Sequence, residues 1–173
     1  MEQRSSEATV HLATDSGLLA ILVPSGLQHR KRDFSWWTRQ DDLLAEANAG
    51  HVVPIETGQG GGYAVRVTFD EPGRREQDLS AQSAEFWLQV DKDEEIAIVT
   101  GEDLSFFDLD SATTIWVTPG PYHVTVTRLR WTEEPDDVAE DVLPDYLVYL
   151  RPLGRDEVPP LLDYIPDLSS DPL

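Results

Sequence analysis

The sequence contains no cysteine and few basic residues. Without cysteine the chain cannot form a disulfide, a thiolate metal site or a cysteine nucleophile, and this composition fits a reducing cytoplasm. Lys and Arg number 13 against 33 Asp and Glu, so the net charge is −20 in 173 residues. So negative a surface is expected to attract basic partners and to repel the phosphate backbone of nucleic acids.

The sequence also lacks a long apolar segment. Residues 1–7 contain no apolar core and do not resemble a secretory signal. The longest apolar run, residues 17–24, is much too short to span a bilayer. Hydrophobic residues still make up 40% of the chain, enough for a sizeable core at this length. We expect a cytoplasmic globular protein that does not act at a membrane.

Residue types that carry catalysis or bind metals do not cluster along the chain. The histidines, His11, His29, His51 and His123, show none of the spacings of metal ligands. A Gly-x-Ser-x-Gly nucleophile elbow is absent. The glycine-rich stretch 58–62 lacks the Lys-Ser/Thr of a phosphate loop and precedes a strand, so a hairpin turn is expected there. We predict no catalytic residue, no metal site and no cofactor.

Apolar and polar residues alternate along most of the chain, which is typical of β-strands with one buried face. The predicted strands are 9–13, 18–23, 52–56, 63–69, 85–90, 95–99, 105–109, 114–117, 122–131 and 145–150. A single helix is predicted near 38–50. Thr38 can cap it, Asp41 and Asp42 suit its N-terminal dipole, and Gly50 can end it.

An internal repeat indicates how the strands are organised. Tyr63-Ala-Val-Arg-Val-Thr resembles Tyr122-His-Val-Thr-Val-Thr at an offset of 59, and the same offset relates Trp87 to Tyr146. Each unit is too small to bury its own apolar face. We therefore predict an all-β fold over residues 1–152, a two-sheet antiparallel β-sandwich built from two similar units with one short inserted helix. An up-and-down barrel is the alternative.

The composition changes after residue 152. The last segment combines prolines with apolar and acidic residues. Proline lacks the N–H that a strand ladder needs, so a central strand is excluded there. We expect residues 153–173 to form a Pro-rich extended tail that packs on the domain or on a partner.

Acidic residues are concentrated in the second half of the chain. Residues 1–86 carry a net charge of −5 and residues 87–173 a net charge of −15, with seven acids and no base over 133–145. A solvated loop is the usual explanation for such a run. Crowded carboxylates also repel one another, which favours a basic partner. The predicted partner-binding residues are the acids Glu133, Glu134, Asp136, Asp137, Glu140 and Asp141, with Leu143, Leu162 and Tyr164 as apolar anchors.

One short segment combines basic and aromatic residues. Arg30-Lys31-Arg32 with Phe34, Trp36 and Trp37 is similar to a stacking footprint for single-stranded nucleic acid. Three bases do not overcome a net charge of −20, so no direct nucleic-acid binding is predicted. The two tryptophans are expected to anchor the inserted segment to the core.

Several short motifs follow one another along the chain: Trp37-Thr38 before an acidic helix ending at Gly50, a Tyr63-Ala-Val-Arg-Val strand, a Leu104-Ser-Phe-Phe-Asp108 strand, a Val117-Thr-Pro-Gly-Pro-Tyr122 turn and an Asp145-Tyr-Leu-Val strand. Taken in this order, they resemble the competence protein J family of bacterial DNA-entry nuclease inhibitors. The resemblance covers roughly residues 9–152. Pro119 lies one place nearer the tyrosine than in the family's Pro-x-Gly-x-Tyr pattern, and the Pro-rich tail is additional.

The resemblance implies an intracellular protein that binds a nuclease and blocks it. Charge alone points the same way, toward an inhibitor or immunity-type protein that covers the basic cleft of a nuclease or toxin. The alternative is a ligand-binding β-sandwich module for carbohydrate or calcium, without catalysis. An enzyme is the third possibility, although no set of residues fills the roles of nucleophile, base and stabiliser.

Overall fold

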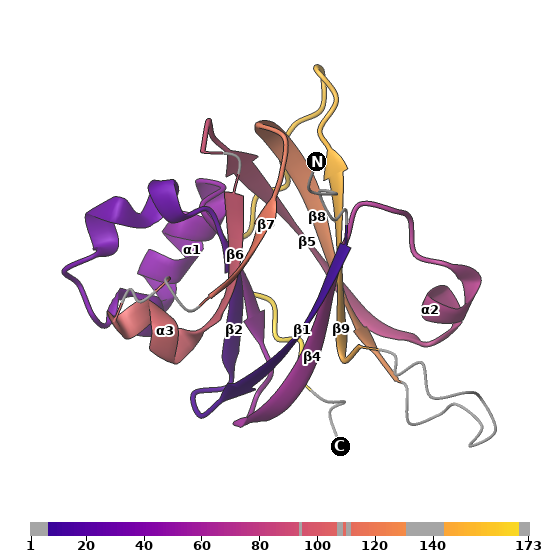
Figure 1. Cartoon of the computed structure of the whole chain (residues 1–173), viewed down its shortest axis with the longest axis horizontal. Coiled ribbons are helices and arrows are strands. Elements are labelled where there is room, and N and C mark those ends of the chain that lie inside the picture. The colour runs from indigo at the N-terminus through magenta and orange to yellow at the C-terminus, as the bar shows by residue number, and fades with distance from the viewer. Residues whose placement is uncertain (1–6, 94, 107–108, 110–111, 131–143, 170–173) are drawn as a thin grey trace, which may run out of the picture.

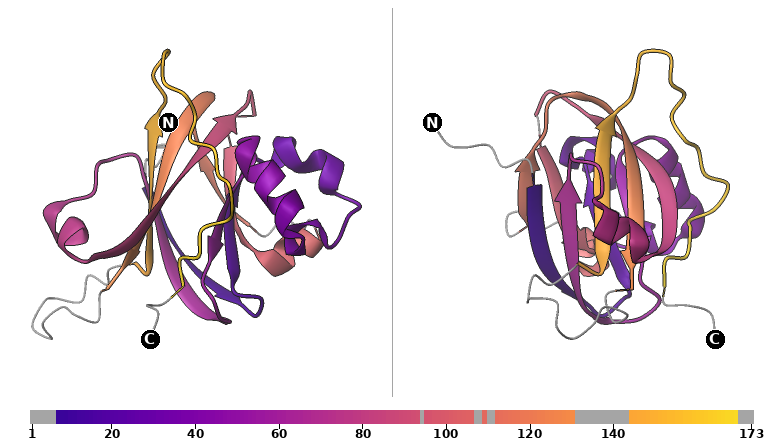
Figure 2. Two further views of the ribbon diagram at one scale, coloured as in Figure 1. Left: turned by 180° about the vertical axis from the view of Figure 1, so that it is seen from behind. Right: turned by 90° about the vertical axis from the view of Figure 1, so that its right-hand side faces the viewer.

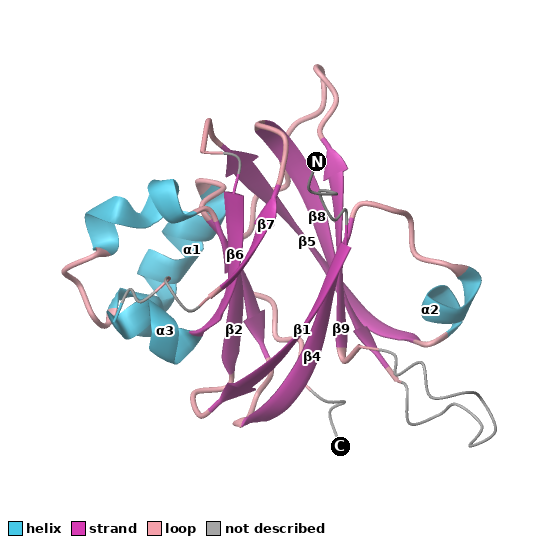
Figure 3. Cartoon of the chain, in the orientation of Figure 1, coloured by secondary structure: helices cyan, strands magenta, loops and turns pink. Residues whose placement is uncertain are grey.

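Two β-sheets pack face to face in the computed structural model of the chain (Figures 1 and 3). The structure describes residues 7–93, 95–106, 109, 112–130 and 144–169. The sandwich predicted from the sequence is therefore confirmed, and the sheets do not close into a barrel. Among the described residues, no helix has the length and apolar character needed to cross a membrane.

The larger sheet has five strands and contains one parallel pair. Its strands, in spatial order, are β1 (Glu7–Thr14), β4 (Gly61–Thr68), β9 (Tyr146–Pro152), β8 (Gly120–Leu129) and β5 (Ser80–Val90). β4 and β9 run parallel, and the other neighbours are antiparallel. Both copies of the repeated Tyr motif, in β4 and β8, lie in this one sheet on either side of β9, so the repeat does not divide between the two sheets.

The smaller sheet is antiparallel, and its two central strands are buried on both faces. Its order is β3 (Val52–Glu56), β2 (Leu18–Leu22), β6 (Glu95–Thr100) and β7 (Thr113–Trp116). Along β2, Leu19 and Ile21 enter the core between the sheets, whereas Ala20 packs in a second apolar cluster on the outer face. Burial of both faces explains why β2 is a continuous apolar run instead of an alternating one.

Helical segments cover the outer face of the smaller sheet. They are η1 (Pro24–Arg30), η2 (Trp36–Thr38), α1 (Gln40–Asn48) and α3 (Gly101–Phe106). Trp36 is fully buried and Trp37 is half-buried against the same outer cluster. Both side chains therefore anchor the inserted segment, as predicted from the sequence.

Two local predictions were wrong. The expected strand 105–109 overlaps α3, and α2 (Arg74–Asp78) is a further short helix, so the helix at α1 does not stand alone. Thr100 starts α3 as a cap: its Oγ1 accepts from the Asp103 N–H at 3.4 Å, and the Asp103 carboxylate accepts from the Thr100 N–H at 3.0 Å. This reciprocal pair is a capping box, and it favours a helix over a strand.

The glycine-rich stretch 58–62 does not form a hairpin turn, which corrects another expectation. It follows β3 in the smaller sheet and leads into β4 in the larger one, so it crosses from one layer to the other. Gly58 has φ +80°, and a Cβ at this position would lie 2.4 Å from the Cβ of Ser169. Glycine is required here because both the backbone angle and the close approach of the tail exclude a side chain.

The segment after β9 runs as an extended strap along the side of the sandwich (Figure 2, left, yellow). Leu168 is buried in the core between the sheets and Ile165 in the outer cluster. The Tyr146 hydroxyl donates to the Leu168 carbonyl at 3.0 Å, and Asp167 forms a parallel bridge with Glu56 at the end of β3. The described part of the tail therefore packs on its own domain.

Candidate functional site

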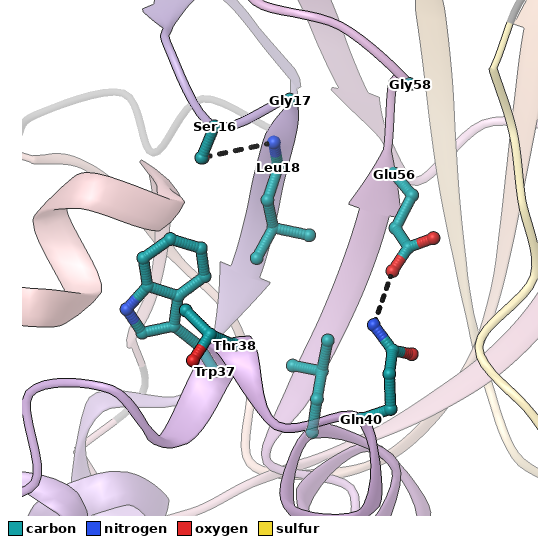
Figure 4. A pocket seen from close by; sticks show the side chains of 9 residues that line it. Ser16, Gly17, Leu18, Trp37, Thr38, Gln40, Glu56 and Gly58 are labelled. Atoms are coloured by element: carbon teal, nitrogen blue, oxygen red, sulfur yellow. Dashed lines mark hydrogen bonds between the residues drawn. The ribbon is translucent and has the colours of Figure 1, made fainter.

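A pocket of about 230 Å³ opens where the inserted helices meet the smaller sheet (Figure 4). Three segments line it: the turn between β1 and β2, the end of β3, and the chain from η2 into α1. Its lining residues are Ser16, Gly17, Leu18, Trp37, Thr38, Gln40, Leu43, Glu56 and Gly58. The volume is below that of typical cofactor or drug pockets, so it suits a single side chain or small group.

The pocket has an aromatic side and an acidic side. Figure 4 shows the Trp37 indole across the opening from the Glu56 carboxylate, with Leu18 between them. Trp37 Nε1 donates to Ser105 Oγ at 2.8 Å, which fixes the ring orientation. Gln40 Nε2 donates to Glu56 Oε1 at 3.1 Å. The second carboxylate oxygen of Glu56 makes no hydrogen bond or ion pair within the described part of the chain.

Glu102 on α3 holds the turn that forms one wall of the pocket. Its carboxylate accepts from the N–H of Asp15 at 3.1 Å, from the N–H of Ser16 at 2.6 Å and from Thr14 Oγ1 at 3.1 Å. Burial alone would raise the pKa of Glu102, but hydrogen bonds to the carboxylate, those from Ser16 among them, lower it to about 2. The group is therefore ionised at neutral pH and adds negative charge beside the pocket.

Negative charge surrounds the opening. Two acids lie near the pocket in addition to Glu56 and Glu102. Asp15 precedes the lining residue Ser16, and Asp167 forms a parallel β-bridge with Glu56. Arg39, which lies between two lining residues in the sequence, forms ion pairs with Asp33 and Asp42. The potential at the pocket therefore favours a cation.

A second charged cluster lies under the inserted segment and stabilises it. Glu46 is 4% exposed, and its carboxylate contacts His29 Nε2 at 2.5 Å, Arg30 Nε at 2.8 Å and His51 Nδ1 at 2.6 Å. Arg30 also lies over the Trp36 ring, 5.6 Å from its centroid. These contacts link η1, α1 and the residue before β3. Arg30 of the basic segment is therefore paired within the fold, whereas Lys31 and Arg32 are exposed.

Several guanidinium groups of the described chain have acidic partners of their own. Arg30, Arg39, Arg66, Arg74 and Arg151 all form ion pairs with Asp or Glu. A set of exposed carboxylates, by contrast, makes no ion pair with any described residue: Asp15, Asp41, Asp70, Glu71, Asp93, Asp156 and Asp163. The surface therefore keeps acidic groups that can meet an external cation.

The structure places only two of the predicted binding residues. Glu133, Glu134, Asp136, Asp137, Glu140, Asp141 and Leu143 lie outside the described residues. Leu162 is half-buried against both apolar clusters, and Tyr164 on the same strap is 73% exposed.

Within the described residues, no group of three or more His, Asp or Glu side chains could hold a metal ion. No sequence motif marks the pocket, although Trp37 was predicted to anchor the inserted segment to the core. Glu56 had no distinguishing pattern, since it ends an ordinary apolar strand. The two residues come together because α1 packs against β3.

Comparison with known proteins finds one family and two solved structures. The family of unknown function DUF6386 matches residues 6–134. A solved chain described as Crocagin biosynthetic gene J superposes with a TM-score of 0.56 at 15% identity, covering 86% of this chain and 99% of that one. ComJ from Bacillus subtilis, described as an inhibitor of the DNA-degrading activity of NucA, gives a TM-score of 0.45 at 10% identity, with coverages of 84% and 96%. No curated protein sequence matches the chain.

Proposed function

The chain belongs to the family of unknown function DUF6386, and we propose that it acts by binding: it occupies the basic surface of a protein partner, a nuclease, and inhibits it. The proposal assigns no catalytic step to the chain itself. It applies to the intact protein, including the acidic segment 133–141.

The observation that carries the proposal is the uncompensated acidity of the surface. The net charge is −20, and Arg30, Arg39, Arg66 and Arg151 form ion pairs with carboxylates of the chain itself. Exposed acids such as Asp41 and Asp163 form no ion pair with any described residue. Like charges at this density destabilise a fold unless a cation meets them, and a basic protein supplies such cations.

A nuclease is a suitable partner because its substrate cleft is basic. Carboxylates placed over that cleft would take the positions of DNA phosphates, and complementary potentials would accelerate association. The order of short motifs from Trp37-Thr38 to Asp145-Tyr146 resembles the competence protein J family, and this supports a nuclease as the partner class. Nucleic acid and anionic membranes are disfavoured as partners by the sign of the charge.

The test is an activity assay with a small basic nuclease encoded beside the gene for this chain. We expect the purified protein to co-purify with it and to abolish cleavage of duplex DNA at equal concentration. Because long-range attraction accelerates association, the on-rate should fall as salt concentration rises. No co-purification and no inhibition at any salt concentration would refute the function.

Charge-neutralising variants test the predicted surface separately. One variant replaces six acids with their amides: Glu133, Glu134, Asp136, Asp137, Glu140 and Asp141. A control replaces exposed acids on other segments, Asp70, Glu71 and Asp93. We expect the first variant to associate at least about tenfold more slowly at low salt and the control to stay close to wild type. Unchanged inhibition by the six-fold variant would remove segment 133–141 from the interface.

A further inference from the structure

We propose that the pocket between Trp37 and Glu56 receives one arginine side chain of the basic partner. This proposal rests on the function proposed above for the identity of the partner, but the pocket can be tested without it. The pocket joins a fixed indole, a carboxylate with an unused oxygen and an apolar base. These are the three features that a guanidinium on an aliphatic stem requires.

The aromatic wall selects a flat cation. Trp37 is held by its hydrogen bond to Ser105 and by packing in the outer apolar cluster. A guanidinium can stack on such a face, and it is less strongly hydrated than an ammonium group, so it loses less hydration on entering. The aliphatic stem of the arginine would lie over Leu18 and Leu43, which are both buried at the base of the pocket.

The acidic wall supplies the counter-charge. Gln40 orients the Glu56 carboxylate through one oxygen and leaves the other available for an external N–H. Glu102 and Asp15 add negative charge next to Ser16, while Arg39 is already paired with Asp33 and Asp42. None of the described residues that line the pocket is basic. Charge complementarity therefore favours a cationic ligand in the pocket.

The size of the pocket sets the scale of the ligand. A volume of about 230 Å³ is smaller than pockets that enclose whole cofactors, which hold roughly 300–1,000 Å³. One long side chain fits a pocket of about 230 Å³, whereas a folded segment would have to remain at the rim. The pocket would act as an anchor point, and the wider acidic surface would provide the steering.

The test titrates the full chain with N-acetyl-L-arginine amide at low salt and follows the indole N–H resonance of Trp37. Assignment of that resonance uses the Trp37→Phe variant. We expect saturable binding that weakens about tenfold in Glu56→Gln, because a charge-assisted hydrogen bond is lost. Glu71→Gln, an exposed acid elsewhere, should leave the Kd unchanged. The citrulline analogue, which is neutral, and the lysine analogue should both bind more weakly.

Three results would overturn the assignment: no saturable binding of the arginine probe, the same Kd in Glu56→Gln, or equal binding of the citrulline or lysine analogue. The two assays distinguish a wrong assignment of the pocket from a wrong proposal for the function. Nuclease inhibition without probe binding would refute the arginine pocket and leave the proposed function in place. Glu56-dependent probe binding without any nuclease inhibition would keep the guanidinium pocket and remove the proposed partner.

Discussion

The side chain of Asn48, at the end of α1, holds the backbone of Leu162 through two hydrogen bonds. Asn48 Nδ2 donates to the Leu162 carbonyl at 2.9 Å, and Asn48 Oδ1 accepts from the Leu162 N–H at 2.8 Å. The two residues are 114 positions apart in the chain. A proline-rich strap cannot join a sheet ladder in the usual way, and this amide supplies the missing backbone partners.

Replacing Asn48 with Ala should release the strap. Both hydrogen bonds are partly buried, so their loss should lower the free energy of unfolding by about 1–3 kcal/mol. Urea denaturation measures this change, and limited proteolysis should cleave the strap faster than in wild type. Gln59→Ala, at an exposed loop residue, serves as the control and should leave both measurements unchanged. Equal protease resistance of Asn48→Ala and wild type would contradict the role of Asn48.

The capping box at the start of α3 gives a second prediction. Thr100→Ala removes the hydroxyl that pairs with the Asp103 backbone and carboxylate. The loss of a cap typically costs about 1 kcal/mol, which corresponds to a fall in Tm of roughly 2–4 °C at this chain length. Thermal unfolding followed by circular dichroism measures it. Thr100→Ser keeps the hydroxyl and should recover most of the loss; if both variants melted alike, the hydroxyl would not be the stabilising group.

The same capping box shows how far the sequence could predict the fold. Alternating strands such as β4 and β8 were recognisable because each buries one face, and the sandwich followed from them. The apolar residues around Leu104 and Phe106 also favoured a strand, but the reciprocal bonds between Thr100 and Asp103 start a helix there. A Thr-x-x-Asp spacing before that run was the local sign of the cap.

The pocket was beyond sequence reasoning for a different reason. Trp37 precedes α1 and Glu56 ends β3, and only the packing of α1 against β3 brings them together. Asn48 and Leu162 meet in the same long-range manner, without any periodicity that connects them. The charge imbalance could be read directly from composition, whereas the pairing of Arg39 with Asp33 and Asp42 required the fold.

The buried carboxylate of Glu46 gives a third prediction. Burial raises the pKa of Glu46, but hydrogen bonds from His51, Arg30 and His29 outweigh this effect and lower it below its ordinary value. Removing the carboxylate in Glu46→Ala would leave Arg30 without its nearest partner in a half-buried site. We expect the free energy of unfolding to fall by about 3–5 kcal/mol, as measured by urea denaturation.

A matched variant separates charge pairing from general packing at this cluster. The side chain of His29 is 54% exposed, so His29→Ala should cost about 1 kcal/mol or less even though His29 also contacts Glu46. Similar losses in His29→Ala and Glu46→Ala would mean that the Glu46 carboxylate is not the centre of the cluster.

Glu102 makes the stability of the chain depend on pH in a defined range. Its pKa is about 2 in the folded protein, below the ordinary value of 4.5, so the unfolded chain binds a proton more readily than the folded one. The stabilisation is therefore fully present above about pH 4.5 and is lost as the pH falls toward 2. Glu102→Gln has no charge to titrate, and its amide cannot accept all the hydrogen bonds that Thr14, Asp15 and Ser16 donate.

We expect Glu102→Gln to be less stable than wild type by about 1–2 kcal/mol at neutral pH, after allowance for solvent screening. The difference should narrow as the pH falls below 4.5, because wild type loses the contribution that the variant never had. Urea denaturation over this pH range measures both curves. The control is Glu71→Gln, at an exposed acid with no ion pair among the described residues. Its free energy of unfolding should change with pH as that of wild type does. A stability difference that stayed constant down to about pH 2 would show that the Glu102 carboxylate is not the titrating support of the turn between β1 and β2.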